Sequence, residues 1–442
     1  MIAAIAGVGG DTMRILTGTL LGALLSTTAL PAFAADLIIE ETPIAVLPVV
    51  GSSTGFYVGA HLGPTIIGVD YDPDVDPPEL YQFSKPSLTA GIAFGWDTML
   101  GSNLVGGIEL RYDLFNAAFS PYEDALGADL YRFQDTLSLT GKLGYLVAPG
   151  TQVYGVLGFG SAGFSAFAGL DDETGRASGL VVGVGAETRL TDLLSATVDV
   201  RYFSAFDEYL VSNDTSFLPR YLAVTAGLKF RFDDGLGHMV EDPTQIDFDF
   251  TGPNVSVSAL AVAASMERDI LVPGADTGPF WSEGVGVGIG LGYDFDIGNG
   301  WVIGATANLD YTPLVFDDAA GNSPDVDAPT KFATVDTVIS AGARLGFKTN
   351  PSTLVYGKLA IAGINTHANE EFFALDGGGS ALLPAVQLGL GVETAIADQV
   401  TLGVEGNYTA ATSPLVVNNS QPEQVDLWPT LLTGKVTLKY HF

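Results

Sequence analysis

Hydrophobic residues in this chain recur at every second position over many separate segments. In Gly284-Val-Gly-Val-Gly-Ile-Gly-Leu-Gly-Tyr293, glycine holds each even position and an aliphatic or aromatic residue holds each odd position. Because successive side chains of a β-strand point to opposite faces, one face of this segment is apolar and the other is almost bare. Segments 180–190 and 222–232 follow the same rule, with Glu, Lys or Arg on the second face. This pattern favours transmembrane β-barrel strands over the alternative, a soluble glycine-rich β-sandwich.

The connections between these segments alternate in length. Short turns are expected at 99–103, 148–150, 191–193 and 350–352, and longer acidic loops at about 64–86, 116–128, 166–178 and 204–219. Outer-membrane barrels have short periplasmic turns and longer external loops. After residue 34 the chain has no apolar run of about 18 residues, so no transmembrane helix is predicted. The pattern therefore predicts an all-β, antiparallel, up-and-down transmembrane barrel.

The second half of the chain repeats the first. Gly183-Val-Gly-Ala-Glu-Thr188 returns as Gly389-Leu-Gly-Val-Glu-Thr394, and Leu228-Lys-Phe-Arg-Phe232 returns as Leu438-Lys-Tyr-His-Phe442. Self-similarity of this quality indicates two copies of one structural unit. We assign residues 54–232 to a first β-barrel repeat and 250–442 to a second. Residues 233–249, rich in Gly, Pro and acids, are predicted to form a periplasmic linker.

The first 34 residues have the features of a bacterial secretory signal. Met13-Arg14 precedes a short apolar stretch, which ends at Ala32-Phe33-Ala34. A charged start, a short apolar core and an A-x-A site predict a signal peptide, cleaved here before Ala35, rather than a membrane anchor. Asp11 does not suit such a start, so we expect translation to begin at Met13. Residues 35–53 are then a periplasmic N-terminal tail, and the protein is expected in the cell outer membrane.

The charge balance is strongly acidic. Asp and Glu number 51 and Lys and Arg 18, which gives a net charge of −33, and the chain has no cysteine. The absence of cysteine excludes disulfides, thiolate metal sites and cysteine nucleophiles. Nucleic acid is not an expected partner, because binding phosphates requires clustered basic residues.

Strand parity places charged residues from both repeats on the inner face. In a narrow barrel these charges are expected to pair across the lumen, because charges shut away from water need partners. The predicted lumen ionic network consists of Asp97, Glu109, Arg111, Lys142, Glu187, Arg189, Asp199, Arg201, Lys229, Arg231, Asp294, Arg344, Lys358, Glu393, Glu405, Lys435 and Lys439.

Two motifs carry a resemblance to a known family. Thr54-Gly-Phe-Tyr-Val-Gly-Ala60 resembles the first strand of the opacity-protein and OmpA-like outer-membrane barrels of Gram-negative bacteria. Leu438, Tyr440 and Phe442 resemble their C-terminal insertion signal. The resemblance covers 54–232 closely and 250–442 more loosely, since Thr251-Gly-Pro253 lacks the aromatic pair. It implies eight strands per repeat and no enzymatic activity, with the outer-membrane lipid, lipopolysaccharide and the barrel-assembly machinery as partners.

Sixteen strands allow two closures. An eight-stranded barrel is filled by its side chains, whereas sixteen strands enclose an aqueous channel. The complete charged set and terminal aromatic residue of each repeat favour two tandem eight-stranded barrels with a structural, envelope-integrity or surface-interaction role. The alternative is one sixteen-stranded porin barrel, formed by duplication, for passive diffusion of small hydrophilic solutes or ions. Adhesion or ligand capture by the loops is a third function class.

The sequence does not predict an enzyme or a cofactor site. His61, His238, His367 and His441 are scattered without metal-ligand spacing. The acidic run 70–79 starts like a calcium loop but has Val75 where the loop needs Gly. We therefore expect no catalytic, cofactor or dedicated metal site, and only loose binding of divalent cations at the acidic loops.

Overall fold

The computed structural model describes residues 54–72, 81–119, 131–168, 171–206, 209–212, 215–232, 245–270, 279–318, 331–373, 379–418 and 424–442. The regular elements in these residues are all β-strands. None of these residues forms a helix with the length and apolar character needed to cross a membrane. The predicted signal peptide, the N-terminal tail and most of the predicted linker lie outside the described residues.

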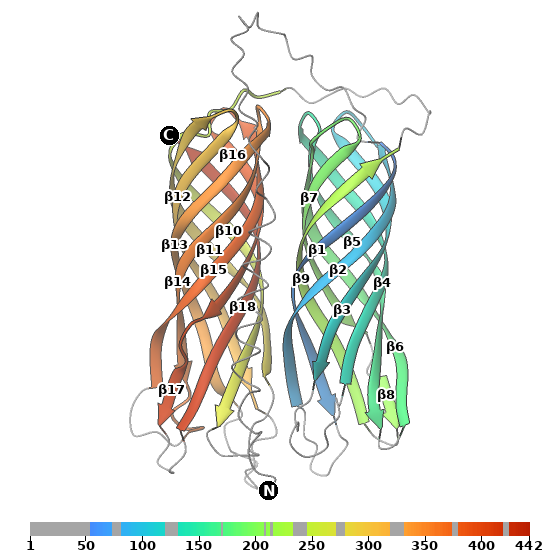
Figure 1. Ribbon diagram of the computed structural model, residues 1–442, viewed down its shortest axis with the longest axis vertical. Helices are drawn as coiled ribbons and strands as arrows, with labels where there is room; N and C mark the ends of the chain where they lie inside the picture. Colours follow the sequence, from blue (N-terminus) through green and yellow to red (C-terminus); the bar gives the residue numbers. More distant parts are fainter. Residues whose placement is uncertain are drawn as a thin grey trace, which may run out of the picture. The chain divides into compact units, whose positions relative to one another are not determined.

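The strands of the first repeat pair in chain order and then close on themselves (Figure 1). Each strand is antiparallel to the next, and β1 also pairs with β9, so that Tyr57 lies opposite both Gly95 and Arg231. The short β8 adds only a hairpin beside β9, and β7 pairs directly with β9. We call these strands the first ring. Their bounds are β1 Gly55–Asp72, β2 Tyr81–Met99, β3 Leu104–Phe119, β4 Tyr131–Ala148, β5 Thr151–Ala168, β6 Asp171–Arg189, β7 Leu194–Ala205, β8 Tyr209–Ser212 and β9 Thr215–Arg231.

The second repeat has the same pairing. Its first strand, β10, pairs with both β11 and β18, so that Asn254 lies opposite Gly292 and His441. The short β17 lies beside β18, as β8 does beside β9. We call these strands the second ring. Their bounds are β10 Gly252–Ile270, β11 Phe280–Gly298, β12 Trp301–Asp317, β13 Lys331–Asn350, β14 Thr353–Ala368, β15 Gly379–Ala397, β16 Val400–Ala411, β17 Leu415–Asn418 and β18 Gln424–His441.

The alternation in the sequence decides which face each side chain occupies. In β3, Ile108, Leu110 and Leu114 are exposed on the outer face, while Glu109 and Arg111 between them are buried. In β11, the odd-numbered aliphatic residues are exposed, and the even-numbered glycines lie on the inner face. A Cβ atom at Gly290 would come within 2.6 Å of Ser256 Oγ and Asn308 Oδ1, so both side chains would have to move to admit it. The all-β antiparallel barrel expected from the sequence is confirmed.

The strands are longer than the sequence pattern suggests. Except for β8 and β17, they span between 12 residues, in β7, and 20 residues, in β13. A membrane-spanning strand needs only about 9–11 residues, so most of these strands continue beyond the hydrocarbon layer. The acidic loops expected at 64–86 and 166–178 are wrong in this respect. In the first, β1 runs to Asp72 and β2 begins at Tyr81, and in the second, β5 runs to Ala168 and β6 begins at Asp171. Acidic and small residues can continue a ladder here, because its hydrogen bonds come from the backbone.

Candidate functional site: the ionic layer of the lumen

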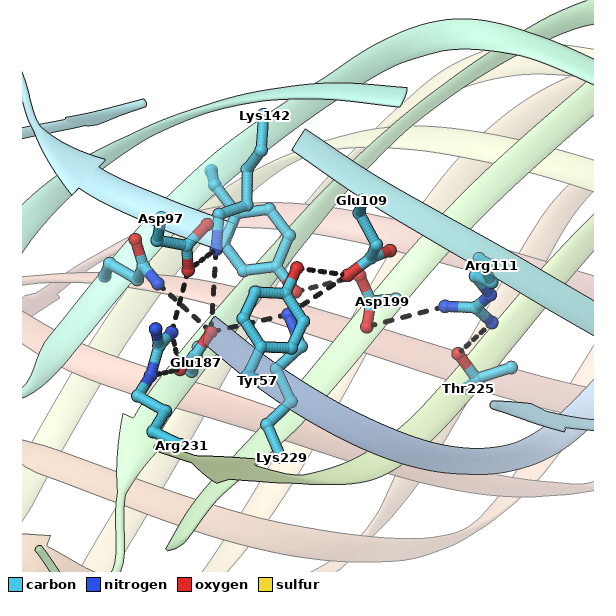
Figure 2. A network of polar contacts seen from close by, with 12 residues as sticks. Tyr57, Asp97, Glu109, Arg111, Lys142, Glu187, Asp199, Thr225, Lys229 and Arg231 are labelled. Atoms are coloured by element: carbon cyan, nitrogen blue, oxygen red, sulfur yellow. Dashed lines mark hydrogen bonds and ion pairs between the residues drawn. The ribbon is translucent and has the colours of Figure 1, made fainter. Parts of the chain in front are cut away.

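The inner face of the first ring carries a network of charged side chains near its short-turn end (Figure 2). Lys142 Nζ lies 2.6 Å from Asp97 and 3.8 Å from Glu187. Arg231 lies 2.8 Å from Asp97 and 2.5 Å from Glu187. Two basic and two acidic side chains from four strands thus form a closed square of ion pairs.

The network continues through Glu109. Lys229 lies 3.4 Å from both Glu187 and Glu109, and the Tyr57 hydroxyl donates to Glu109 at 2.7 Å. Arg201 donates to Glu109 at 2.5 Å. Glu109 is on β3 and Arg201 on β7, which are the third and seventh of eight full-length strands around the ring. These two side chains therefore meet from opposite walls of the lumen.

The side of the network nearest the long loops ends at Asp113. Arg111 donates to Asp113 at 3.0 Å and to the Thr225 hydroxyl at 3.1 Å, and it lies 3.9 Å from Asp199. His61 is 2.6 Å from Asp113. In the contacts described above, five carboxylates face five Lys and Arg side chains, so each of these buried charges has an opposite charge beside it, as buried charges require. Arg189 adds a sixth buried basic side chain to the inner face.

Aromatic rings add to the stabilisation of the basic groups. Lys142 Nζ lies 4.9 Å from the ring centre of Tyr154, and Lys229 Nζ lies 4.5 Å from that of Tyr57. A cation this close to the face of a ring is attracted by its quadrupole, more strongly where water is absent. The Tyr154 hydroxyl also donates to Asp199 at 2.9 Å. Each tyrosine thus stabilises a lysine with its ring and donates a hydrogen bond to a carboxylate with its hydroxyl.

The second ring carries a smaller version of the same layer. Arg344 binds Asp294 through two nitrogens, each at 2.7 Å, and contacts Glu393 at 2.5 Å. Glu393 is also 2.6 Å from Lys439 and 3.0 Å from His441. The two-pronged Arg–carboxylate contact fixes the orientation of both groups.

A separate pair of contacts lies deeper in the second ring. Lys358 is 2.5 Å from Glu405, which also accepts the Tyr356 hydroxyl at 2.7 Å. Lys435 is 2.6 Å from Asp310. The ionic layer here is less continuous than in the first ring, and a cavity of about 40 Å³ lies within it. That volume suits a water molecule or two rather than a solute.

On the long-loop side, the ionic layer of the first ring gives way to packed aromatic residues. Tyr131 on β4 stacks on Phe217 on β9 at 4.8 Å, and these strands face each other across the ring. Phe115 contacts Phe133 and Tyr221, with ring centres at 4.9 and 5.0 Å. In the second ring, an apolar cluster occupies the corresponding level and includes Leu260, Met266, Phe280, Phe316 and Phe332. Polar and apolar layers together fill each lumen.

The structure places all seventeen predicted network residues on the inner face of the strands. Fifteen of them are buried, and Glu405 and Lys439 are half-buried. The pairing across the lumen also involves residues that the sequence analysis did not select, namely Tyr57, His61, Asp113, Tyr154, Asp310, Tyr356 and His441. Parity alone would have found Asp113, Tyr356 and His441, because each lies two residues from a selected charge on the same strand. The other four lie on β1, β5 and β12, on which no charge was selected.

The other predicted features are the C-terminal insertion signal and the absence of a dedicated metal site. Leu438, Tyr440 and Phe442 point outward and are 45%, 40% and 69% exposed, on the face expected for a membrane-insertion signal. Among the described residues, no three His, Asp or Glu side chains are arranged to hold a metal ion. Part of the acidic run 70–79, and His238, lie outside the described residues.

Comparison with known proteins identifies the family. A family model described as the outer membrane protein beta-barrel domain matches residues 20–232 and again 244–442. The chain belongs to this outer-membrane β-barrel family. The expected resemblance to opacity-type and OmpA-like barrels is thereby confirmed, as is the outer membrane as the location.

Several solved structures of barrel proteins resemble the chain. Neisserial surface protein A is 15% identical, with 40% of this chain and 97% of that chain covered and a TM-score of 0.28. The Yersinia pestis attachment invasion locus protein Ail is 15% identical, with 40% and 99% covered and a TM-score of 0.24. A mutant of the TodX monoaromatic hydrocarbon channel is 10% identical, with 88% and 91% covered and a TM-score of 0.28. No curated protein sequence matches the chain significantly.

Proposed function

We propose that this barrel protein acts as two tandem eight-stranded barrels with sealed lumens, and that it supports the integrity of the outer membrane or surface contacts made by its loops. On this view it is not a diffusion pore and not an enzyme. Its partners are the outer-membrane lipid, lipopolysaccharide and, during insertion, the assembly machinery. The outward bands of Leu, Ile and Phe are the surfaces that would contact lipid.

One observation carries the proposal, the Arg201–Glu109 contact between opposite walls of the first ring. This 2.5 Å contact bridges the lumen, and the cavity beside it, lined by Glu109, Asp199 and Lys229, has a volume of only about 10 Å³, which is too small for a solute. The ladders that join β1 to β9 and β10 to β18 support separate closure. A single sixteen-stranded pore would instead need β1 to pair with β18 and β9 with β10 along their lengths.

Planar-bilayer recording of the refolded full-length protein tests the sealed lumens. We expect no steps of open-pore size, because paired charges and stacked rings block both lumens. Stable, large conductance steps would overturn the proposal and favour the porin. Separate closure is tested by expressing residues 35–240 alone, which we expect to give a folded band that shifts on heating. A fragment that never gives this band, although the full chain does, would contradict separate closure.

A further inference from the structure

The segment Ile246–Phe250, which Thr251 alone separates from the start of β10, occupies the short-turn mouth of the second ring. Phe248 and Phe250 are only 3% and 0% exposed, although they lie in a segment without regular structure. They belong to one apolar cluster with Val302, Leu354, Tyr356 and Ala395. The His441 ring meets Phe248 edge-on, with ring centres 5.0 Å apart. The side chains that receive the two phenylalanines lie on the inner face, so the segment closes the lumen itself.

Three hydrogen bonds hold the backbone of this segment to one turn. The Ile246 N–H donates to Ser352 Oγ at 3.1 Å, and the Ser352 hydroxyl donates to the Ile246 carbonyl at 2.5 Å. The Phe248 N–H donates to the Pro351 carbonyl at 3.2 Å. Ser352 and Pro351 form the turn between β13 and β14. The phenylalanines are therefore docked in one defined place and not merely collapsed on an apolar surface.

The first ring provides an internal comparison, because its mouth is closed by its own wall. There Gln152 donates to Glu187 at 3.0 Å, and Arg231 binds both Glu187 and Asp97. Four mouth positions differ between the repeats. The first has Tyr57, Gln152, Arg189 and Arg231, where the second has Asn254, Leu354, Ala395 and His441.

Because of these differences, the side chains at the second mouth are shorter and less polar than those at the first. An arginine is replaced by alanine, another arginine by histidine, a glutamine by leucine and a tyrosine by asparagine. The result is a shorter and more apolar rim, which two phenylalanine rings can fill. The shorter, more apolar wall residues and the segment that fills the mouth thus occur together in the second repeat.

We propose that Ile246–Phe250 is a stopper that closes the periplasmic mouth of the second ring and seals the polar cavity behind it. Ser256, Thr306 and Thr401 line this cavity together with charged residues of the network. Apart from its chain connection to β10 through Thr251, the stopper is held by side-chain packing and by hydrogen bonds to one turn, so it can leave without opening a strand pair. The first ring has no such removable part among the described residues. This inference goes beyond the proposed structural role, because it assigns a closable compartment to one repeat alone.

Thiol labelling tests the stopper in the full-length protein, which has no cysteine of its own. A single cysteine at Ser256, inside the cavity, is reacted with a small charged methanethiosulfonate in detergent or vesicles. We expect the Phe248→Ser/Phe250→Ser change to raise its labelling rate at least tenfold, because the mouth is then open to water. A cysteine at the buried Ser138 in the first ring is the matched control, and its rate should stay constant. An unchanged rate at position 256 in a folded variant would overturn the stopper.

Two further variants keep the test decisive if the double variant does not fold. Ser352→Ala removes only the hydrogen bonds to Ile246, and we expect severalfold faster labelling at position 256. Leu354→Gln/Ala395→Arg gives the second mouth the residues of the first at two of the four differing positions, and we expect it to expel the stopper. A cysteine at Phe250 should then label at least tenfold faster than in the unaltered mouth, and equal rates would contradict the model. Conductance of the unaltered protein tests the sealed lumens separately, so either proposal can fail without the other.

Discussion

Replacing Glu187 by Gln should destabilise the first ring strongly. Glu187 lies 2.5 Å from Arg231, 3.4 Å from Lys229 and 3.8 Å from Lys142, and its side chain is only 4% exposed. Gln keeps the shape but removes the negative charge, so three buried cations are left with fewer counter-charges. Removing one partner of a buried ion pair costs about 3–5 kcal/mol. Since each ~1.4 kcal/mol is a factor of ten, the unfolding equilibrium should shift by about two to three and a half powers of ten.

Tryptophan fluorescence during denaturant unfolding can follow this ring separately. Trp96 is the one tryptophan in residues 54–232, so changing Trp281, Trp301 and Trp428 to Phe leaves a reporter of the first repeat. The same background without the Glu187 change is the reference, and heat-induced band shifts verify folding before each titration.

The chain offers a matched exposed ion pair as a control. Arg176 lies 2.7 Å from Asp135, but its side chain is 45% exposed, so Arg176→Gln should cost only about 0–1 kcal/mol. The reasoning predicts a large gap between the two variants. If Glu187→Gln costs no more than Arg176→Gln, the lumen charges are screened by water and the sealed ionic layer is refuted.

Two other changes test the wall and the chain end. Gly158→Ala should destabilise the first ring by about 1–3 kcal/mol, because the new Cβ overlaps the Leu139 carbonyl oxygen and the backbone must shift. Gly141→Ala is the control, because a Cβ there would lie 3.7 Å from its nearest neighbour, and it should be nearly neutral in the same fluorescence titration. Phe442→Ser should reduce the heat-shifting folded band in cells but not after refolding in detergent, because Phe442 is 69% exposed and packs little. Phe232→Ser is the control, and it should change neither the amount of folded protein in cells nor the yield after refolding. If Phe232→Ser and Phe442→Ser reduce the folded band in cells equally, a terminal insertion signal is contradicted.

The sequence predicts the faces of the strands well because the pleat has a fixed period of two. Once Leu228, Phe230 and Phe232 are assigned to the outside, Lys229 and Arg231 must point inward, and the structure places them there. The same period places the ionic layer without any knowledge of tertiary contacts. The strand ends are less predictable, as Asp171 at the start of β6 illustrates. Beyond the membrane the outer face no longer needs apolar residues, so the alternation disappears while the ladder continues.

The sequence does not predict which charges meet. Arg201 and Glu109 are 92 residues apart and contact only because β3 and β7 face each other in a closed ring. Residues on opposite strands reach the same height according to the tilt and shear of the barrel, which no local pattern encodes. The sequence does not predict the aromatic layer either, for a different reason. Leu114 points outward and Phe115 inward, so both faces are apolar there and the alternation carries no information.

The comparison of the two repeats explains why their interiors have diverged unevenly. Lys142, Asp97 and Glu187 have counterparts in Arg344, Asp294 and Glu393, and each trio is joined by direct ion pairs. A change at one member of such a group leaves a buried charge unpaired, so single substitutions there are costly. The mouth residues of the first ring are buried as well, so one of them can be lost only where another side chain fills its space. The second repeat meets this condition, because it has Leu354, Ala395 and His441 at these positions and Phe248 and Phe250 fill the space that remains.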